Sequence, residues 1–262
     1  MADFDNRVAR ASTTVDYIDA GLRGYMLRIY NYMLAGLVVT GLTSYGTFLA
    51  AVTDNPANAA HLSDGRIAQV APGIMLTSLG VTLFTGPLMW VLLFASLGLV
   101  LFLSFRINKM SVGAAQASFL GYAALVGVTF ASLFVVYTYA SIAQVFFITA
   151  ATFGAMSLWG YTTKTDLTGF GHFLIMGLFG IIIASIVGFF WHSTMLQWVI
   201  SVAGVLIFTG LTAYDTQALK YSYVANEDAT VTGRKAIFGA LKLYLDFINL
   251  FLMLLRLMGN RR

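Results

Sequence analysis

The stretch GALKLYLDFINLFLMLLRLMG, residues 239–259, decides the fold because it combines a long apolar run with a periodic row of mostly polar side chains. On a helix these side chains recur at spacings of four, three, four, three and four, which places them along one face. The row consists of Lys242, Asp246, Asn249, Met253, Arg256 and Asn260. An ionised group deep in a bilayer is costly unless it is paired or hydrated, so this helix cannot face lipid on all sides. The sequence therefore predicts that it lies inside a bundle.

The composition indicates a chain that lies mostly in a membrane. Of 262 residues, 59% are hydrophobic and only 10% are charged, against about 25% charged residues in soluble domains. The absence of cysteine excludes disulfides, thiolate nucleophiles and cysteine-ligated metals. The basic residues are scattered over the connections between apolar runs, so the net charge of +4 reflects membrane topology rather than a nucleic-acid partner.

Seven apolar segments are long enough to cross a hydrocarbon core of ~30 Å at 1.5 Å per residue. We expect an all-α, polytopic membrane protein with helices at about residues 29–52, 88–105, 113–137, 141–161, 170–190, 196–219 and 236–258. Residues 1–27 form a predicted cytosolic N-terminal segment, and residues 28–262 the membrane domain. Gly86-Pro87 interrupts the long run 74–105, so residues 74–85 are expected to be an interfacial segment or a helical lead-in.

Two segments carry small residues at every fourth position, a spacing that lets membrane helices approach closely. One row contains Ala123, Gly127 and Ala131, and the other contains Gly180, Ala184 and Gly188. We expect both rows to lie at helix contacts.

The seventh segment departs from the charge rule that the first six obey. Six crossings leave the basic connections on one side, but a full seventh crossing would place Arg256, Arg261 and Arg262 on the other. Either the segment re-enters and leaves on the cytosolic side, or it crosses as a buried helix positioned by packing. The absence of Gly and Pro between Leu241 and Met258 favours one continuous crossing helix.

Asp215 and Asp246 form a candidate carboxylate pair at matched depth on the last two segments. Asp215 lies five residues before Lys220, and Asp246 four residues after Lys242, so each carboxylate lies roughly 6 to 8 Å inside the nearest basic residue. Two carboxylates close together in a low-dielectric site cannot both ionise readily, so such a pair holds one proton in common. Their oxygens also suit a weak contact with calcium.

Each aspartate also has a purely structural interpretation. An acidic residue near a helix end can reach water, and Lys242 stands four residues before Asp246 as a partner on the same helix. Two such residues at one depth, one of them on a polar row, favour a functional pair. Arg106 ends the second segment at the same membrane face, where position alone makes it a topological charge.

Several phrases of the chain resemble a bacterial member of the Bax inhibitor-1 family, also called the transmembrane Bax inhibitor motif family. They are LRGYMLRIYNYMLAGL, SFRINKMSVG, FGAMSLWGYTTKTDLTGFGHFLIMGL, LTAYDTQALK and GALKLYLDFINLFLMLLRLMG. The likeness covers nearly all of the chain after about residue 20. It implies a seven-helix bundle in the cell (inner) membrane with the final helix at its centre.

The same resemblance implies a function and assigns roles to residues. It implies a proton-sensitive calcium leak gated by an aspartate pair, here Asp215 and Asp246, with Arg106 as a latch onto the sixth-helix aspartate. Lys242, Asn249 and Arg256, on the same helix as Asp246, are the candidate pore residues. One departure is that residues 88–105 contain no acidic residue, although some members have one in this helix.

Two other classes of protein share features with the sequence. Intramembrane aspartyl proteases also use two aspartates, one in a Tyr-Asp pair as in Tyr214-Asp215, but Leu-Tyr-Leu precedes Asp246 and no Pro-Ala-Leu follows. A membrane scaffold or stress regulator that binds other membrane proteins without conducting would use the polar row as a packing seam. We therefore expect no enzyme, no cofactor and no resident metal, with calcium as the transported ion.

Overall fold

The computed structural model describes residues 2–62, 65–71, 73–191 and 193–262, with side chains described from residue 20 onward. Its helices are α1 (Ala2–Ala51), α2 (Ser78–Phe84), α3 (Leu88–Arg106), α4 (Val112–Val136), α5 (Tyr139–Thr162), α6 (Thr168–Phe190), α7 (Thr194–Tyr221) and α8 (Ala229–Met258), with short 3-10 turns at Pro56–Asn58 and Ile107–Lys109. In the described residues, α1 from Ala20 onward and α3 to α8 are long and apolar enough to cross a membrane. The all-α, polytopic prediction is confirmed.

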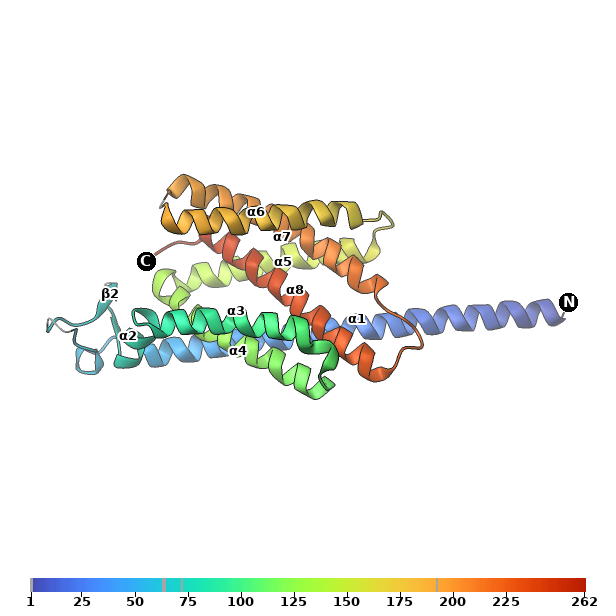
Figure 1. Ribbon diagram of the computed structural model, residues 1–262, viewed down its shortest axis with the longest axis horizontal. Helices are drawn as coiled ribbons and strands as arrows, with labels where there is room; N and C mark the ends of the chain where they lie inside the picture. Colours follow the sequence, from blue (N-terminus) through green and yellow to red (C-terminus); the bar gives the residue numbers. More distant parts are fainter. Residues whose placement is uncertain (1, 63–64, 72, 192) are drawn as a thin grey trace.

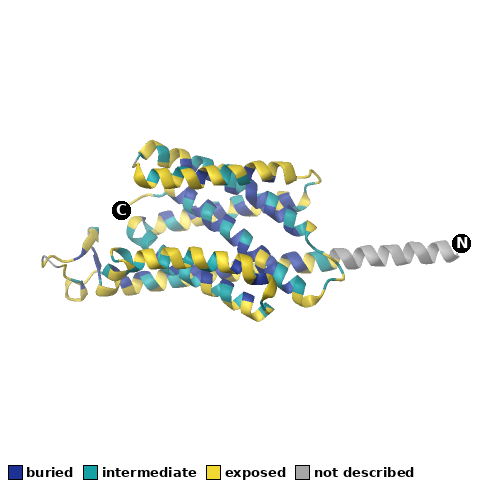
Figure 2. Ribbon diagram, viewed as in Figure 1, coloured by how far each residue is buried: buried dark blue, intermediate teal, exposed yellow. Residues whose placement is uncertain are grey.

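Helix α8 runs through the middle of the bundle (Figure 1). It contacts α7, α1, α5 and α4. In its most apolar 18-residue window 72% of the residues are buried, whereas the other six spans range from 6% to 33%. Figure 2 shows the same contrast, with buried residues gathered on α8 and exposed ones on the outer helices. The predicted central position of the last helix is confirmed.

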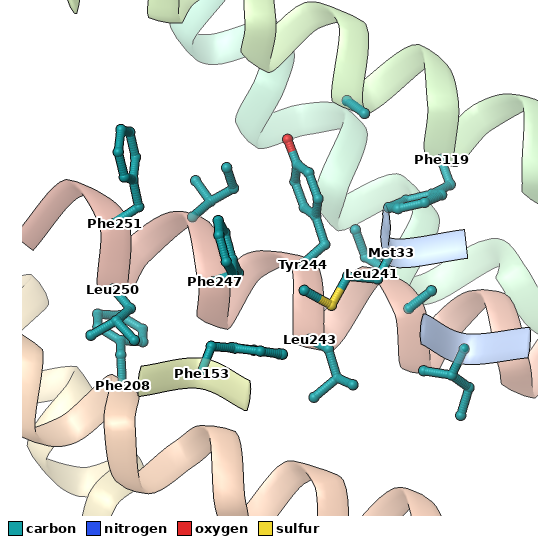
Figure 3. Packing of buried hydrophobic residues seen from close by; sticks show 14 of the residues in the cluster. Met33, Phe119, Phe153, Phe208, Leu241, Leu243, Tyr244, Phe247, Leu250 and Phe251 are labelled. Carbon is teal, nitrogen blue, oxygen red and sulfur yellow. The ribbon is translucent and has the colours of Figure 1, made fainter. Parts of the chain in front are cut away.

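Aromatic side chains fill the space between α8 and its neighbours (Figure 3). The rings of Phe119 on α4 and Tyr244 pack edge to face with centroids 5.6 Å apart, and those of Phe153 on α5 and Phe247 do so at 5.5 Å. Such pairs add stabilisation beyond the burial of their area. The core therefore fixes α8 against helices on opposite sides of the bundle.

The structure has α8 crossing the bundle as one continuous helix. In its second turn, Arg234 Nη1 donates to the carbonyl of Met110, at 3.3 Å. Beyond its end, the N–H of Arg262 donates to the carbonyl of Val136, at 3.0 Å. Met110 precedes α4 and Val136 ends it, so the two ends of α8 lie at opposite ends of the bundle. We call the end with the α3–α4, α5–α6 and α7–α8 connections the basic end, and the other the C-terminal end.

Three short strands between α1 and α2 form a small sheet that was not predicted from the sequence. Strands β1 (Val52–Thr53), β2 (Gln69–Ala71) and β3 (Ile74–Leu76) pair antiparallel in the order β1-β3-β2. The lead-in expected over residues 74–85 is helical only as α2, because residues 74–76 form β3. Helix α3 begins after Pro87, as the Gly86-Pro87 interruption predicts.

Two helices, α1 and α8, begin more than two residues earlier than predicted. Helix α1 starts at Ala2, so no break separates residues 2–27 from the first span; residue 1 and the side chains before residue 20 lie outside the described part of the chain. Helix α8 starts at Ala229 because the Asp228 side chain accepts from the N–H groups of Thr230, at 2.7 Å, and Val231, at 3.4 Å. These hydrogen bonds lower the pKa of Asp228 below its ordinary value. The cytosolic location of the N-terminal segment stays a prediction.

Candidate carboxylate pair in a membrane cleft

Asp215 and Lys242 form an ion pair between α7 and α8. Lys242 Nζ lies 2.7 Å from Asp215 Oδ1, and it lies 5.6 Å from the centre of the Tyr214 ring. Lys242 therefore pairs across the helix contact, and not with Asp246 on its own helix as the i−4 spacing suggested. The Asp215 side chain is buried, whereas that of Lys242 is 40% exposed.

Glycines allow α7 and α8 to approach closely enough for this pairing. A Cβ on Gly204 of α7 would lie 2.7 Å from Met253 Cγ, and one on Gly239 of α8 would lie 2.8 Å from Leu219 Cδ2. Both distances are shorter than carbon atoms tolerate, so a larger residue at either position would require the facing Met253 or Leu219 side chain to move. The two contacts lie on either side of the ion pair along α8.

Asp246 lies one turn of α8 after Lys242 and is only 6% exposed. Its carboxyl group is within hydrogen-bonding reach of that of Asp215. Its Oδ2 accepts no hydrogen bond from any described residue. Two carboxylates cannot donate to each other, so this contact is attractive only when a proton lies between them. The structure thus brings together the two aspartates that the sequence analysis paired.

The pair lies on the wall of a cleft between α3, α6, α7 and α8. The cleft has a volume of about 1300 Å³, and its apolar walls include residues such as Leu97, Leu178 and Phe208. Its charged lining residues, within the described chain, are Asp215, Lys242, Asp246 and Arg256, and Asn249 lies between the last two on α8. The three candidate pore residues therefore share one cleft with the pair.

Asn249 and Arg256 lie along α8 on the C-terminal side of the pair. Asn249 Nδ2 donates to the carbonyl of Leu245 at 2.8 Å, a bond within its own helix. Arg256 is exposed to the cleft and also lines a second cavity of about 690 Å³ between α3, α4 and α8. The polar row predicted from residues 239–259 thus follows the cleft from Lys242 to Arg256.

Arg106 stands at the last residue of α3 and is exposed. Asp215, its predicted partner, is held by Lys242. In the described conformation the carboxylate that the latch would need is therefore already paired with Lys242. A role of Arg106 as a latch stays a prediction.

Hydroxyl groups behind Asp215 connect three helices, and the sequence analysis did not identify them. Tyr30 on α1 and Ser157 on α5 have their oxygens 2.5 Å apart, and Ser157 lies 3.0 Å from Thr216 Oγ1 on α7. Thr216 also donates to the carbonyl of Thr212 at 2.7 Å. This series of hydrogen bonds ends at Thr216, the residue next to Asp215, and fixes that part of α7.

Gln217 is a second residue that the sequence analysis missed. It is buried, its side-chain oxygen accepts from the N–H of Leu167 at 2.8 Å, and its amide donates to the carbonyl of Thr165 at 2.8 Å. It therefore ties α7 to the α5–α6 connection at the basic end. Its sequence signal was an amide two residues after Asp215, in the part of the segment that also contains Thr212 and Thr216.

The residues described do not include a group of three or more His, Cys, Asp or Glu side chains that could hold a metal ion. Calcium takes six to eight oxygen ligands in stable protein sites. Asp215 and Asp246 could supply part of such a set, with the rest from water in the cleft. The arrangement suits transient contact with a cation better than tight storage.

The sequence matches the profile of the family described as "Inhibitor of apoptosis-promoting Bax1" over residues 22–262. The chain belongs to the Bax inhibitor-1 family. It is similar to the inner membrane protein YbhL of Escherichia coli K12, with 45% identity covering 93% of this chain and 94% of the relative. It also resembles uncharacterised proteins of Caulobacter vibrioides, 43% identical, and Rickettsia prowazekii, 38% identical, each match covering the full length of both chains. The predicted family resemblance is confirmed.

Proposed function

We propose that this Bax inhibitor-1 family protein is a multi-pass inner-membrane cation leak whose conduction is controlled by protonation of the Asp215–Asp246 pair. The observation that carries the proposal is the contact between two buried carboxyl groups on the wall of a large cleft. Inner-membrane location is supported by the similarity to YbhL, an inner membrane protein. The N-terminus is proposed to be cytosolic, from the distribution of basic residues.

The contact between the two carboxyl groups supports control by protons, because it is attractive or repulsive according to whether the pair is protonated. With one proton between them, the carboxyl groups attract each other and hold α7 against α8. Without that proton they repel, and the helices that carry them are driven apart beside the cleft. A small movement there would change the width of the path along α8.

Calcium is the proposed cargo, because carboxylate oxygens are the ligands it prefers and the family resemblance implies it. We propose no enzymatic role and no cofactor. The alternative is a scaffold that binds other membrane proteins. The ion pair of Asp215 with Lys242 favours this alternative, because such a pair can hold α7 against α8 without any role in conduction.

Calcium flux into dye-loaded liposomes containing the purified protein tests the proposal, stepped from about pH 6 to about pH 8. Wild type should leak in a pH-dependent way, and Asp215→Asn and Asp246→Asn should flatten that dependence, because neither asparagine can share a carboxyl proton. Arg106→Ala tests the latch separately: an altered pH dependence would support the latch, and an unchanged one would contradict it. If wild type and all variants are folded but equally silent, the leak is wrong and a scaffold role is favoured.

A further inference from the structure

Lys242 occupies the position at the carboxylate pair that a free cation would take. Its ammonium group is 2.7 Å from Asp215 Oδ1 and therefore replaces a bound cation on that carboxylate. Yet it is not buried with its partner, since the side chain is 40% exposed and borders a cleft of about 1300 Å³. Lysine has a flexible four-carbon stem, so the ammonium can leave Asp215 without any movement of α8.

The charges at the carboxylate pair balance when Lys242 is counted. Asp215 and Asp246 with one shared proton carry a single negative charge, which the ammonium neutralises. Described residues from α3 and α6 contribute only uncharged side chains to the cleft, and Arg256 lies ten residues further along α8, roughly 15 Å away along the helix axis. An incoming divalent cation would therefore meet a neutral site that already contains a positive charge.

Asp246 supplies the independent sign that the site can take a ligand. Its Oδ2 is buried and has no hydrogen-bond donor among the described residues, although it is only one turn of α8 away from Lys242. A buried carboxylate oxygen without a donor is costly. A cation that displaced the ammonium would reach this oxygen and Asp215 together.

We propose that Lys242 is the tethered resident cation of the Asp215–Asp246 pair, and that any free cation binding the pair must displace it. Lys242 is then a specificity-determining residue, because its tethered charge weakens the binding of divalent cations to the pair. The inference rests on the proposed leak for its role in transport, but the binding competition itself does not.

Direct calcium binding tests the competition without a membrane. Equilibrium dialysis with radioactive calcium would use the purified full-length protein in detergent micelles near neutral pH. Lys242→Met should bind calcium at least about tenfold more tightly than wild type, because a positive charge beside the carboxylates is removed. Lys242→Arg keeps the tethered charge and should bind as weakly as wild type.

Two further variants establish that the gain arises at this site. Adding Asp246→Asn to Lys242→Met should abolish the gain, whereas Lys109→Gln, which removes an exposed charge at the same end of the bundle, should bind like wild type. Because losing one partner of a buried ion pair is destabilising, Lys242→Gln is made in parallel, as its amide can still donate to Asp215. It should also bind more tightly than wild type.

The inference is wrong if folded Lys242→Gln or Lys242→Met binds calcium no more tightly than wild type. It is also wrong if the gain survives Asp246→Asn, or if Lys109→Gln shows the same gain. These outcomes are read from binding, whereas the leak is judged from flux. Failure of one is therefore distinguishable from failure of the other.

Discussion

Tyr244 shows how a single side chain ties the central helix to two others. Its hydroxyl is 2.7 Å from Thr40 Oγ1 on α1, and Thr40 in turn donates to the carbonyl of Ala123 on α4 at 2.9 Å. Tyr244 is fully buried, and its ring packs against those of Phe119 and Tyr122. The hydroxyl therefore adds a polar contact within a largely apolar core.

Tyr244→Phe should lower the free energy of unfolding by about 1 kcal/mol, the net contribution of one buried hydrogen bond. The cost stays modest because Thr40 keeps the carbonyls of Gly36 and Ala123 as acceptors. Denaturant unfolding in detergent micelles measures it, with Tyr221→Phe on the exposed end of α7 as the matched control. Equal stability of the two variants would show that the Tyr244 hydroxyl contributes nothing.

The ion pair of Lys242 could not be predicted from sequence spacing. The i−4 relation to Asp246 is a property of one helix, but the partner that Lys242 selects lies on another. The same limit applies to Tyr30, Ser157 and Thr216, whose hydroxyl contacts join three segments. Sequence placed Asp215 and Asp246 at one depth because depth follows from counting residues, whereas side-chain partners depend on packing.

At the scale of helices, close approach of α5 to α7 positions the segment that carries Asp215. A Cβ on Gly160 of α5 would overlap the backbone of Ala213 on α7, whereas one on Gly154 of the same helix would meet nothing within 4 Å. Backbone atoms cannot move aside as a flexible side chain can. Gly160 is therefore the residue that lets α5 support α7 two residues before Asp215.

Gly160→Ala should destabilise the protein by about 1 to 3 kcal/mol, the usual cost of overpacking. Gly154→Ala should be neutral or slightly stabilising, because alanine is the better helix former and the site is open. Thermal unfolding in micelles gives both values. A Gly160→Ala protein as stable as the Gly154→Ala protein would contradict the close approach of α5 and α7.

Small-residue spacing predicted one helix contact fully and another only in part. Ala123 and Ala131 are fully buried, and a Cβ on Gly127 would meet Thr43 and the Thr40 carbonyl of α1. In the second row, on α6, Gly180 is exposed with nothing within 4 Å of an added Cβ, whereas a Cβ on Gly188 would lie 3.5 Å from Leu196 Cδ2 of α7. Small residues permit close approach, but the facing helix must be present, and the sequence does not say which helix that is.

At the scale of the whole molecule, the predicted bundle with a central last helix is what the sequence specified best. The polar row on residues 239–259 made a lipid-facing position too costly, and this reasoning needed no partner residues. The sheet of β1, β2 and β3 escaped prediction because its strands are two or three residues long. Such strands are too short to show an alternating pattern.

Topology is testable because the chain contains no cysteine. Single cysteines at Lys109 and Lys164 should react with a membrane-impermeant thiol reagent only from the cytosolic side, as the basic connections predict. Cysteines at Asn58 and Arg262 should react only from the opposite side, because α8 crosses completely. Labelling of Arg262→Cys from the same side as Lys109→Cys would contradict the crossing helix.

The central claim is that Asp215 and Asp246 act as one unit through a shared proton. When two groups share a proton, the effects of substituting them do not add, because replacing either one already removes the interaction. The most direct measurement is calcium flux of the Asp215→Asn/Asp246→Asn double variant in liposomes at about pH 6 and about pH 8, beside both single variants. We predict that the pH dependence, taken as the larger of the two fluxes divided by the smaller, is the same in the double variant and both single variants. In all three it should be smaller than in wild type. A double variant whose ratio changes by the combined effects of the two single variants would show that the aspartates act independently, and would contradict the account.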